Sequence, residues 1–222
     1  MPSPLIPYRG LNDLGGFFSL SPIISGAGWR SGAELVADLD DAVEDYLDRL
    51  RTDRADIAGS LLVQGWAARL TAVHLGSIAL TGTAPDLAAE AVDVRLPARG
   101  TLEVHPRTAG LVDADAAWRR LADGHLSPLI DAVHTSCRSG RRRLWGNVAA
   151  VRAGAVVELR RNGFPSASPE PMEVVRLGRW VRPHVYARTT CCGLVRIPGR
   201  AACGDCVLRF RPSGRAAAEE LP

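Results

Sequence analysis

The sequence predicts an α+β fold that is predominantly helical, with a small β element and a cysteine-rich region near its C-terminal end. Apolar residues recur every three to four positions through much of residues 31–152, which is the period of an amphipathic helix. Two short segments instead alternate apolar and polar residues, as a strand does. Four of the five cysteines fall within residues 191–206. We expect a mainly helical domain over residues 1–161 and a cysteine-rich region over residues 173–212.

The helical predictions rest on caps and periodicity. Ser31 and Glu34 have the spacing of a capping box, and the helix that they begin keeps its apolar period as far as Leu50. A second helix is predicted over residues 53–73, where many small residues permit close packing against other helices. Further helical patterns cover residues 113–123, 127–137 and 141–152.

The β predictions involve two parts of the chain. Residues 92–96 and 101–105 alternate around a Pro-Ala-Arg-Gly turn, which predicts a β-hairpin near 92–105. Residues 162–172 are rich in proline, serine and glycine and are expected to form a linker or long loop. The chain after it, over residues 180–188, is predicted to be extended and to lead into the cysteines.

Composition argues against a membrane or secreted protein. The most apolar stretch, residues 57–80, is interrupted by Gln64, Arg69 and His74 and is not expected to span a membrane. The first residues lack the basic-then-apolar pattern of a signal peptide. A chain of this length can bury a core without disulfides. We therefore expect a cytoplasmic protein whose clustered cysteines bind metal or do redox chemistry.

Charge is unevenly distributed along the chain. All 27 basic residues are arginine, and the net charge is +3. Residues 138–222 hold 16 arginines against 6 acids, whereas residues 1–137 hold 11 arginines against 18 acids. The basic half suggests an anionic partner or ligand, although arginines that merely coat a solvated surface would give the same count.

The cysteines have the number and spacing of a metal site. Cys203 and Cys206 form a C-x-x-C pair in which Gly204 eases the turn. Cys191 and Cys192 are adjacent, and neighbouring side chains of an extended chain point to opposite faces. A binuclear [2Fe–2S] cluster accepts thiolates from more directions than a single zinc ion, so the doublet favours the cluster. A Cys₄ zinc site and a redox disulfide remain alternatives.

These residues carry a family resemblance. The segment RTTCCGLVRIPG at residues 188–199, followed by CGDC at 203–206, resembles the C-terminal signature of FhuF-like ferric-siderophore reductases. LWGNVA at residues 144–149 is similar to the Trp-Gly-Asn helix of that family, and residues 54–87 are similar to its small-residue helical region. The resemblance spans most of residues 50–210. It implies a [2Fe–2S] cluster held by Cys191, Cys192, Cys203 and Cys206.

The resemblance also implies an enzyme that reduces Fe(III) in ferric siderophores by one electron, so that Fe(II) is released. No catalytic residue beyond the cluster ligands is expected. The glycine run at residues 26–32 has the wrong spacing for a dinucleotide loop, so the electron donor should be external, either a ferredoxin or a flavin- or NAD(P)H-dependent reductase. The candidates for docking the ferric siderophore are Arg138, Arg141, Arg142, Arg143, Arg188 and Arg196.

Two other functions stay open at this point. One is a zinc module that contacts nucleic acid or protein, and the other is a ferredoxin-like electron carrier. Residues 138–143 lack the interleaved aromatics typical of nucleic-acid binding, so we expect no nucleic-acid partner. Cys137 is expected to be buried and inert, and the five histidines to be structural or surface residues rather than ligands.

Overall fold

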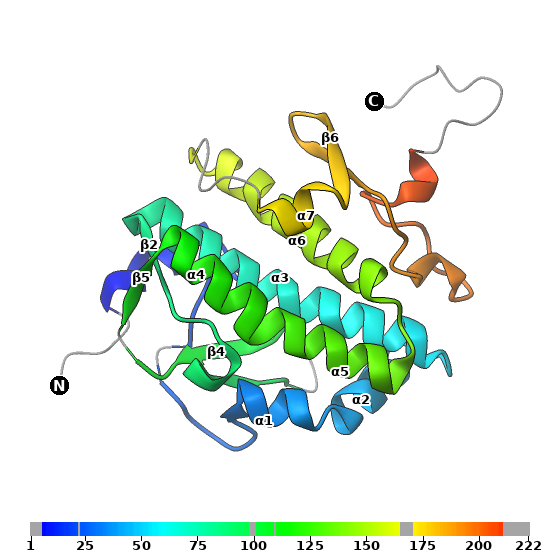
Figure 1. Ribbon diagram of the computed structural model, residues 1–222, viewed down its shortest axis with the longest axis horizontal. Helices are drawn as coiled ribbons and strands as arrows, with labels where there is room; N and C mark the ends of the chain where they lie inside the picture. The colour runs from blue at the N-terminus through cyan, green and yellow to red at the C-terminus, as the bar shows by residue number, and fades with distance from the viewer. Residues whose placement is uncertain (1–5, 22, 98–100, 109, 165–170, 211–222) are drawn as a thin grey trace.

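The longest helix, α3 (Ala55–Thr81), runs through the middle of the molecule and organises the fold. Eighteen of its 27 residues are buried, on all sides of the helix. Its main packing partner is α6 (Arg141–Arg161), which lies alongside it (Figure 1). A helix that is apolar all round must be enclosed by other elements. The computed structural model describes residues 6–21, 23–97, 101–108, 110–164 and 171–210.

Several shorter helices pack around α3. The segment η1 (Ile6–Leu14) packs on the C-terminal half of α3, where Gly76 lets Phe18 and Leu11 approach closely. A π-helical segment, η3 (Ala122–Leu126), joins two helices that flank α3. The others are α1 (Gly32–Ala37), α2 (Asp40–Leu50), α4 (Ala114–Leu121), α5 (Ser127–Cys137) and α7 (Met172–Val175), with a short 3₁₀ turn η2 (Ala89–Ala91).

Helix boundaries differ from the sequence prediction in two ways. The capping box of Ser31 is present, with Glu34 N–H donating to Ser31 Oγ at 3.0 Å, but the helix that it begins ends at Asp38. A second helix starts at Asp40, because acidic residues in a first turn stabilise a new N-terminus. The helices predicted at 53–73 and 141–152 both continue for two more turns or longer, and α3 ends at Gly82 in the left-handed conformation.

Within the described residues, three small antiparallel sheets complete the fold, which is α+β and predominantly helical as predicted. The pair of β3 and β4 coincides with the hairpin predicted near residues 92–105, with Val94 opposite Val104. The strands are β1 (Arg30–Ser31), β3 (Val92–Arg95) and β4 (Glu103–Pro106) in one sheet, β2 (Thr83–Pro85) and β5 (Leu111–Asp113) in the second, and β6 (Gly178–Arg182) and β7 (Val185–Arg188) in the third.

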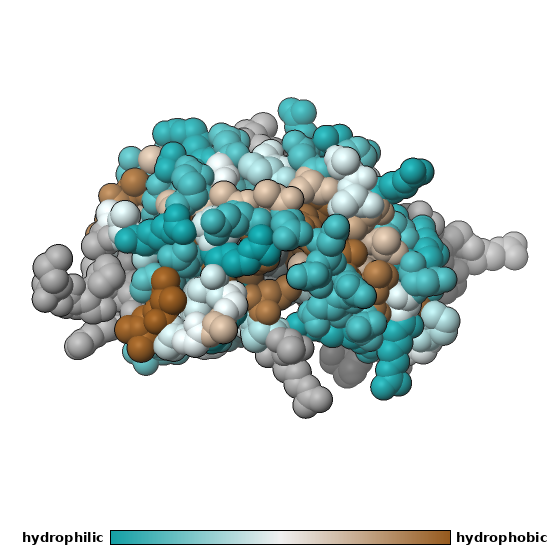
Figure 2. Space-filling model, turned by 90° about the horizontal axis from the view of Figure 1, so that it is seen from below, coloured by the Kyte–Doolittle hydropathy of each residue, from teal (hydrophilic) through white to brown (hydrophobic). Residues whose placement is uncertain are grey.

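The predicted linker at residues 162–172 lies partly outside the described residues, at 165–170. After it, the β6–β7 hairpin and the cysteine segment pack on one side of α6 (Figure 1). Hydrophilic side chains cover most of the face that Figure 2 shows, and the apolar ones on it gather in small groups. No helix in the described parts of the chain has the length and apolar character that crossing a membrane requires.

Candidate metal centre

The four clustered cysteines lie on two loops at the end of the molecule nearest the start of α6 (Figure 1). Strand β7 leads into Cys191 and Cys192, and the chain then turns back through η4 (Leu194–Arg196). The second loop carries Cys203 and Cys206 and ends in η5 (Val207–Arg209). The backbone N–H of Arg188 donates to the carbonyl of Asp205 at 3.1 Å and joins the two loops.

The four sulfurs form two pairs, each with one member from each loop. Cys192 Sγ lies 3.8 Å from Cys203 Sγ, and Cys191 Sγ lies 4.0 Å from Cys206 Sγ. Two thiolates on one tetrahedral ion are about 3.8 Å apart when the metal–sulfur bond is about 2.3 Å. Among the described residues, no three His, Cys, Asp or Glu side chains converge closely enough to hold a single ion. Each of the two contacts therefore has the separation of two thiolates that share one metal ion.

The doublet now has a structural explanation. Cys191 and Cys192 belong to different pairs, as expected where adjacent side chains diverge. Cys192 and Cys206 are buried, with 1% and 0% of their surface exposed, whereas Cys191 and Cys203 are partly exposed. Each pair thus has one inner and one outer thiol, so the centre lies close to the protein surface.

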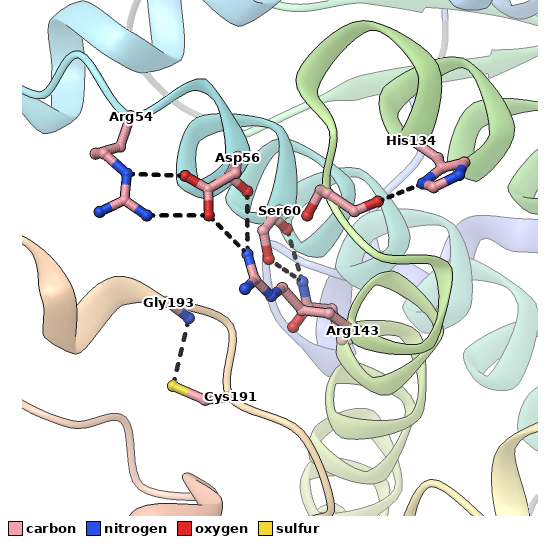
Figure 3. Close-up of polar contacts among 9 residues, drawn as sticks. Arg54, Asp56, Ser60, His134, Arg143, Cys191 and Gly193 are labelled. Carbon is pink, nitrogen blue, oxygen red and sulfur yellow. Dashed lines mark hydrogen bonds and ion pairs between the residues drawn. The ribbon is translucent and has the colours of Figure 1, made fainter.

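Gly193 fits the turn after the doublet for two reasons. Its φ is +99°, in the region that favours glycine, and a Cβ there would lie 3.1 Å from Ile57 Cγ1 of α3. The close approach presses the doublet against the first turn of α3. Gly193 N–H points at Cys191 Sγ at 3.4 Å (Figure 3). Such N–H donors to sulfur favour the reduced, more negative form of an iron–sulfur cluster.

The thiols perturb one another's acidity. The hydrogen bond from Cys203, together with the N–H of Leu194 and the charge of Arg188, lowers the pKa of Cys192 to about 6 against the opposing effect of burial. The same hydrogen bond, with burial, raises the pKa of Cys203. Burial raises the pKa of Cys191. The two shifts run in opposite directions, so this pair favours a thiolate at Cys192 and a thiol at Cys203.

A buried polar chain supports the second loop. Arg188 donates through Nε to Asp205 Oδ2 at 2.7 Å and through Nη1 to Asn147 Oδ1 at 2.6 Å. Asn147 donates in turn to the carbonyl and hydroxyl oxygens of Ser60 at 2.7 and 2.9 Å. The chain connects α3, α6, β7 and the loop between Cys203 and Cys206. Only 1% of the Arg188 side chain is exposed, so it presents no open surface, although it lines the cavity described below.

The Trp145-Gly146-Asn147 segment of α6 receives its explanation from these contacts. A Cβ on Gly146 would overlap Thr190 Oγ1, so glycine lets the residue before the doublet lie against the helix. Asn147 satisfies the polar chain, and Trp145 is partly buried against the core. Sequence reasoning singled out this segment only through the family resemblance. The partners Ser60, Thr190 and Asp205 were missed because they are remote from it in sequence.

The basic segment at the start of α6 is partly neutralised. Arg143 donates to Asp56 Oδ2 at 3.1 Å, and Arg54 donates to Asp56 Oδ1 at 3.0 Å (Figure 3). Burial would raise the pKa of Asp56, but the two arginines outweigh it and lower the value. Arg141 likewise pairs with Asp131 at 2.6 Å. The other surface candidates, Arg138, Arg142 and Arg196, are exposed and form no ion pair with the described residues.

A cavity of about 630 Å³ opens beside the second cysteine loop. Its walls come from α3, α6 and the β6–β7 hairpin, and Gly204 and Asp205 form part of its edge. The lining is mostly apolar, and its polar groups include Arg161 and the buried Arg188. One of these, Arg161, pairs with Glu158 at 3.2 Å, so the rim is close to neutral there. A small molecule in this cavity would touch the two residues between Cys203 and Cys206.

Two of the remaining candidates, Cys137 and His125, are buried. Cys137 is buried, with 4% exposed, and its Sγ packs where Gly59 of α3 leaves room. His125 is fully buried, accepting from Trp66 Nε1 at 3.0 Å and bonding the Leu87 carbonyl at 2.9 Å. His184 lies exposed at the cavity and joins no metal-binding group of described residues.

No protein-family model matches this chain, and no curated protein matches it either. The FhuF-like resemblance therefore rests on the motifs alone and stays a prediction.

Proposed function

We propose that this protein holds a [2Fe–2S] cluster and reduces Fe(III) in ferric siderophores by one-electron transfer. The observation that supports it most is the closeness of the sulfurs, with Cys192 Sγ 3.8 Å from Cys203 Sγ and Cys191 Sγ 4.0 Å from Cys206 Sγ. A [2Fe–2S] cluster needs two thiolates on each of two irons. Cys191 and Cys206 would bind one iron, and Cys192 and Cys203 the other.

When bound, the cluster would supply single electrons near the protein surface. The Fe(III) of the siderophore is the substrate, and hard anionic oxygens bind it strongly. Gaining one electron makes the ion softer and less charged, so the chelate loosens and Fe(II) can leave. The chain's own residues would hold the cluster in place. The four thiols would be its ligands, the Gly193 N–H would donate to a cysteine sulfur, and Arg188 would fix the second cysteine loop. This chemistry requires no acid–base residue.

We propose the cavity beside Gly204 and Asp205 as the site of the chelate. Its size suits a small organic ligand, since such pockets commonly measure about 300–1,000 Å³. Its edge includes the loop between two proposed cluster ligands, which would keep the path for the electron short. The five free thiols favour a reducing compartment, so we place the protein in the cytoplasm, with an external ferredoxin or reductase as donor.

Single turnover tests the activity. Protein purified without oxygen is reduced with dithionite, freed of excess reductant and mixed with a ferric hydroxamate and a ferrous trap. We expect about one Fe(II) trapped per cluster, from the one-electron capacity of a [2Fe–2S] centre, with the reduced spectrum returning to the oxidised one. A reduced cluster that persists and releases no Fe(II) would reject the reductase and favour an electron carrier.

The cavity can be tested separately at Gly154, which lines it and where a Cβ would meet no atom within 4 Å. Gly154→Trp should obstruct the cavity and raise KM for the chelate while leaving the visible spectrum unchanged. Gly154→Ala is the matched control, because it adds only a methyl group at the same helical position. An unchanged KM in a folded Gly154→Trp protein would place the chelate elsewhere.

A further inference from the structure

The segment that carries the cysteines is strongly basic and almost free of carboxylates. Residues 174–210 contain seven arginines and one acid, a net charge of +6 before the cysteines are counted. The acid is Asp205, and its carboxylate is already bound by the buried Arg188. The other six arginines are all exposed and form no ion pair with described residues: Arg176, Arg179, Arg182, Arg196, Arg200 and Arg209.

This pattern differs from the rest of the surface, where most arginines have a carboxylate partner. On the helical part, for example, Arg30 pairs with Asp38 and Arg120 pairs with Asp86. Unpaired charges of one sign create a potential that attracts an oppositely charged partner from a distance. The excess positive charge of the described chain is therefore concentrated around the cysteine loops.

Three of these arginines flank the proposed ligands directly. Arg196 follows Cys192 by four residues, Arg200 precedes Cys203 by three, and Arg209 follows Cys206 by three. We call these three residues the arginine rim. Leu208, next to Arg209, is an exposed apolar side chain with 44% of its surface accessible. Cys191 and Cys203 are themselves partly exposed.

We propose that the arginine rim is the docking surface for an acidic one-electron donor protein. The proposal rests on the proposed function, because an external donor is needed only if the cysteines hold a redox centre. Interfaces of electron-transfer partners are small and short-lived, and complementary charge raises their association rate more than their affinity. In the transfer, the reduced donor loses one electron and this protein gains one, and no proton or group moves.

The observations favour a protein over the two other anions considered. A nucleic-acid surface combines basic residues with exposed aromatics on which bases stack. In residues 174–210 the large exposed apolar side chains are instead aliphatic: Val175, Val181 and Leu208. A ferric chelate is small, and the cavity beside Gly204 and Asp205 suits it better than three exposed arginines do.

The test uses a plant-type ferredoxin with a strongly acidic surface as the probe. Binding of oxidised ferredoxin is measured first by calorimetry at low and at physiological salt, because it requires no turnover. Electron transfer from reduced ferredoxin is then followed by stopped flow. Arg200→Glu is compared with Arg119→Glu, an equal change of charge at an exposed arginine of α4, which lies away from the cysteine loops (Figure 1).

We expect Arg200→Glu to lower the association rate constant about tenfold at low salt and to weaken its salt dependence, because a steering charge is lost. Arg119→Glu should change the rate less than about twofold by the same reasoning. Both variants should keep the wild-type visible spectrum. Equal effects of the two substitutions would overturn the proposal, since only total charge would then matter.

Two further outcomes are informative. Salt-dependent binding of a single-stranded DNA oligonucleotide, without binding of ferredoxin, would overturn the proposal in favour of a nucleic-acid surface. Rim-dependent binding of oxidised ferredoxin without any electron transfer would support the docking surface and count against the proposed reductase. Failure of the docking surface and failure of the proposed reductase are therefore distinguishable.

Discussion

The contact between Gly146 and Thr190 gives a double-mutant test of how the cysteine loops are seated on α6. Gly146→Ala would place a methyl group on Thr190 Oγ1. Thr190→Ala removes that oxygen, and the nearest remaining atom, the β-carbon of residue 190, lies 3.4 Å from the new methyl group, at ordinary contact distance. The hydroxyl is also buried without a hydrogen-bond partner among the described residues, so its loss should be nearly neutral.

The magnitudes follow from opposing effects. Overpacking costs about 1–3 kcal/mol, whereas alanine in place of glycine within a helix gains about 1 kcal/mol. Gly146→Ala alone should therefore lower the free energy of unfolding by about 1 kcal/mol, and should raise it by about 1 kcal/mol when Thr190 is already alanine. The predicted coupling is about 2 kcal/mol, which corresponds to about 4–8 °C in Tm for a chain of this size.

The assay is thermal unfolding of the four proteins followed by circular dichroism, with iron content measured on each. Gly146→Ala should also retain less iron, because the displaced Thr190 adjoins Cys191, and the double variant should recover it. Additive changes in Tm would refute the reasoning, since sites that do not touch add to within about 0.5 kcal/mol.

Three further predictions concern other parts of the molecule. Burial lowers the pKa of His74 to about 3 and of His125 to about 4, so both are neutral in the fold. An unfolded histidine has a pKa of about 6.5, so stability is complete above that value and about 4 kcal/mol is lost by pH 5. Urea unfolding of the metal-free, reduced protein at pH 7.5 and 5.0 checks this, and equal free energies would contradict it. Cys192→Ser should abolish the visible absorption of the cluster, and Cys137→Ser, the control, should retain it. An intact visible spectrum in Cys192→Ser would show that Cys192 is not a ligand. Asn147→Ala should destabilise the protein by about 1–3 kcal/mol, because it leaves one N–H group of the buried Arg188 guanidinium without its acceptor; a loss below about 0.5 kcal/mol, measured by urea unfolding, would contradict that expectation.

Features encoded by neighbouring residues could be predicted from the sequence. The capping box of Ser31 and the strand pair around residues 92–105 depend on residues a few positions apart. The break between α1 and α2 could not be predicted in this way. Apolar residues keep their helical spacing across Asp38, and only the acidic run that follows hints at a second N-terminus.

The clustering of the four cysteines was predictable from the sequence, whereas the residues that support their loops were not. Cysteine spacing singles out four thiols, and the structure brings them together in pairs. The burial of Arg188 depends on Asn147, 41 positions away, and on a loop that returns to meet it. The available signal was Asn147, a polar side chain among the apolar neighbours Val148 and Ala149 of α6, because buried polar groups require partners. An arginine that sequence places on a surface was therefore found inside the protein.

The identity of the metal centre tests the account most directly. Protein purified without oxygen is examined by absorption spectroscopy, and iron, acid-labile sulfide and zinc are assayed on the same sample. We expect a coloured protein with about two irons and two sulfides per chain, the content of a [2Fe–2S] cluster. A colourless protein with one zinc and no sulfide would contradict it.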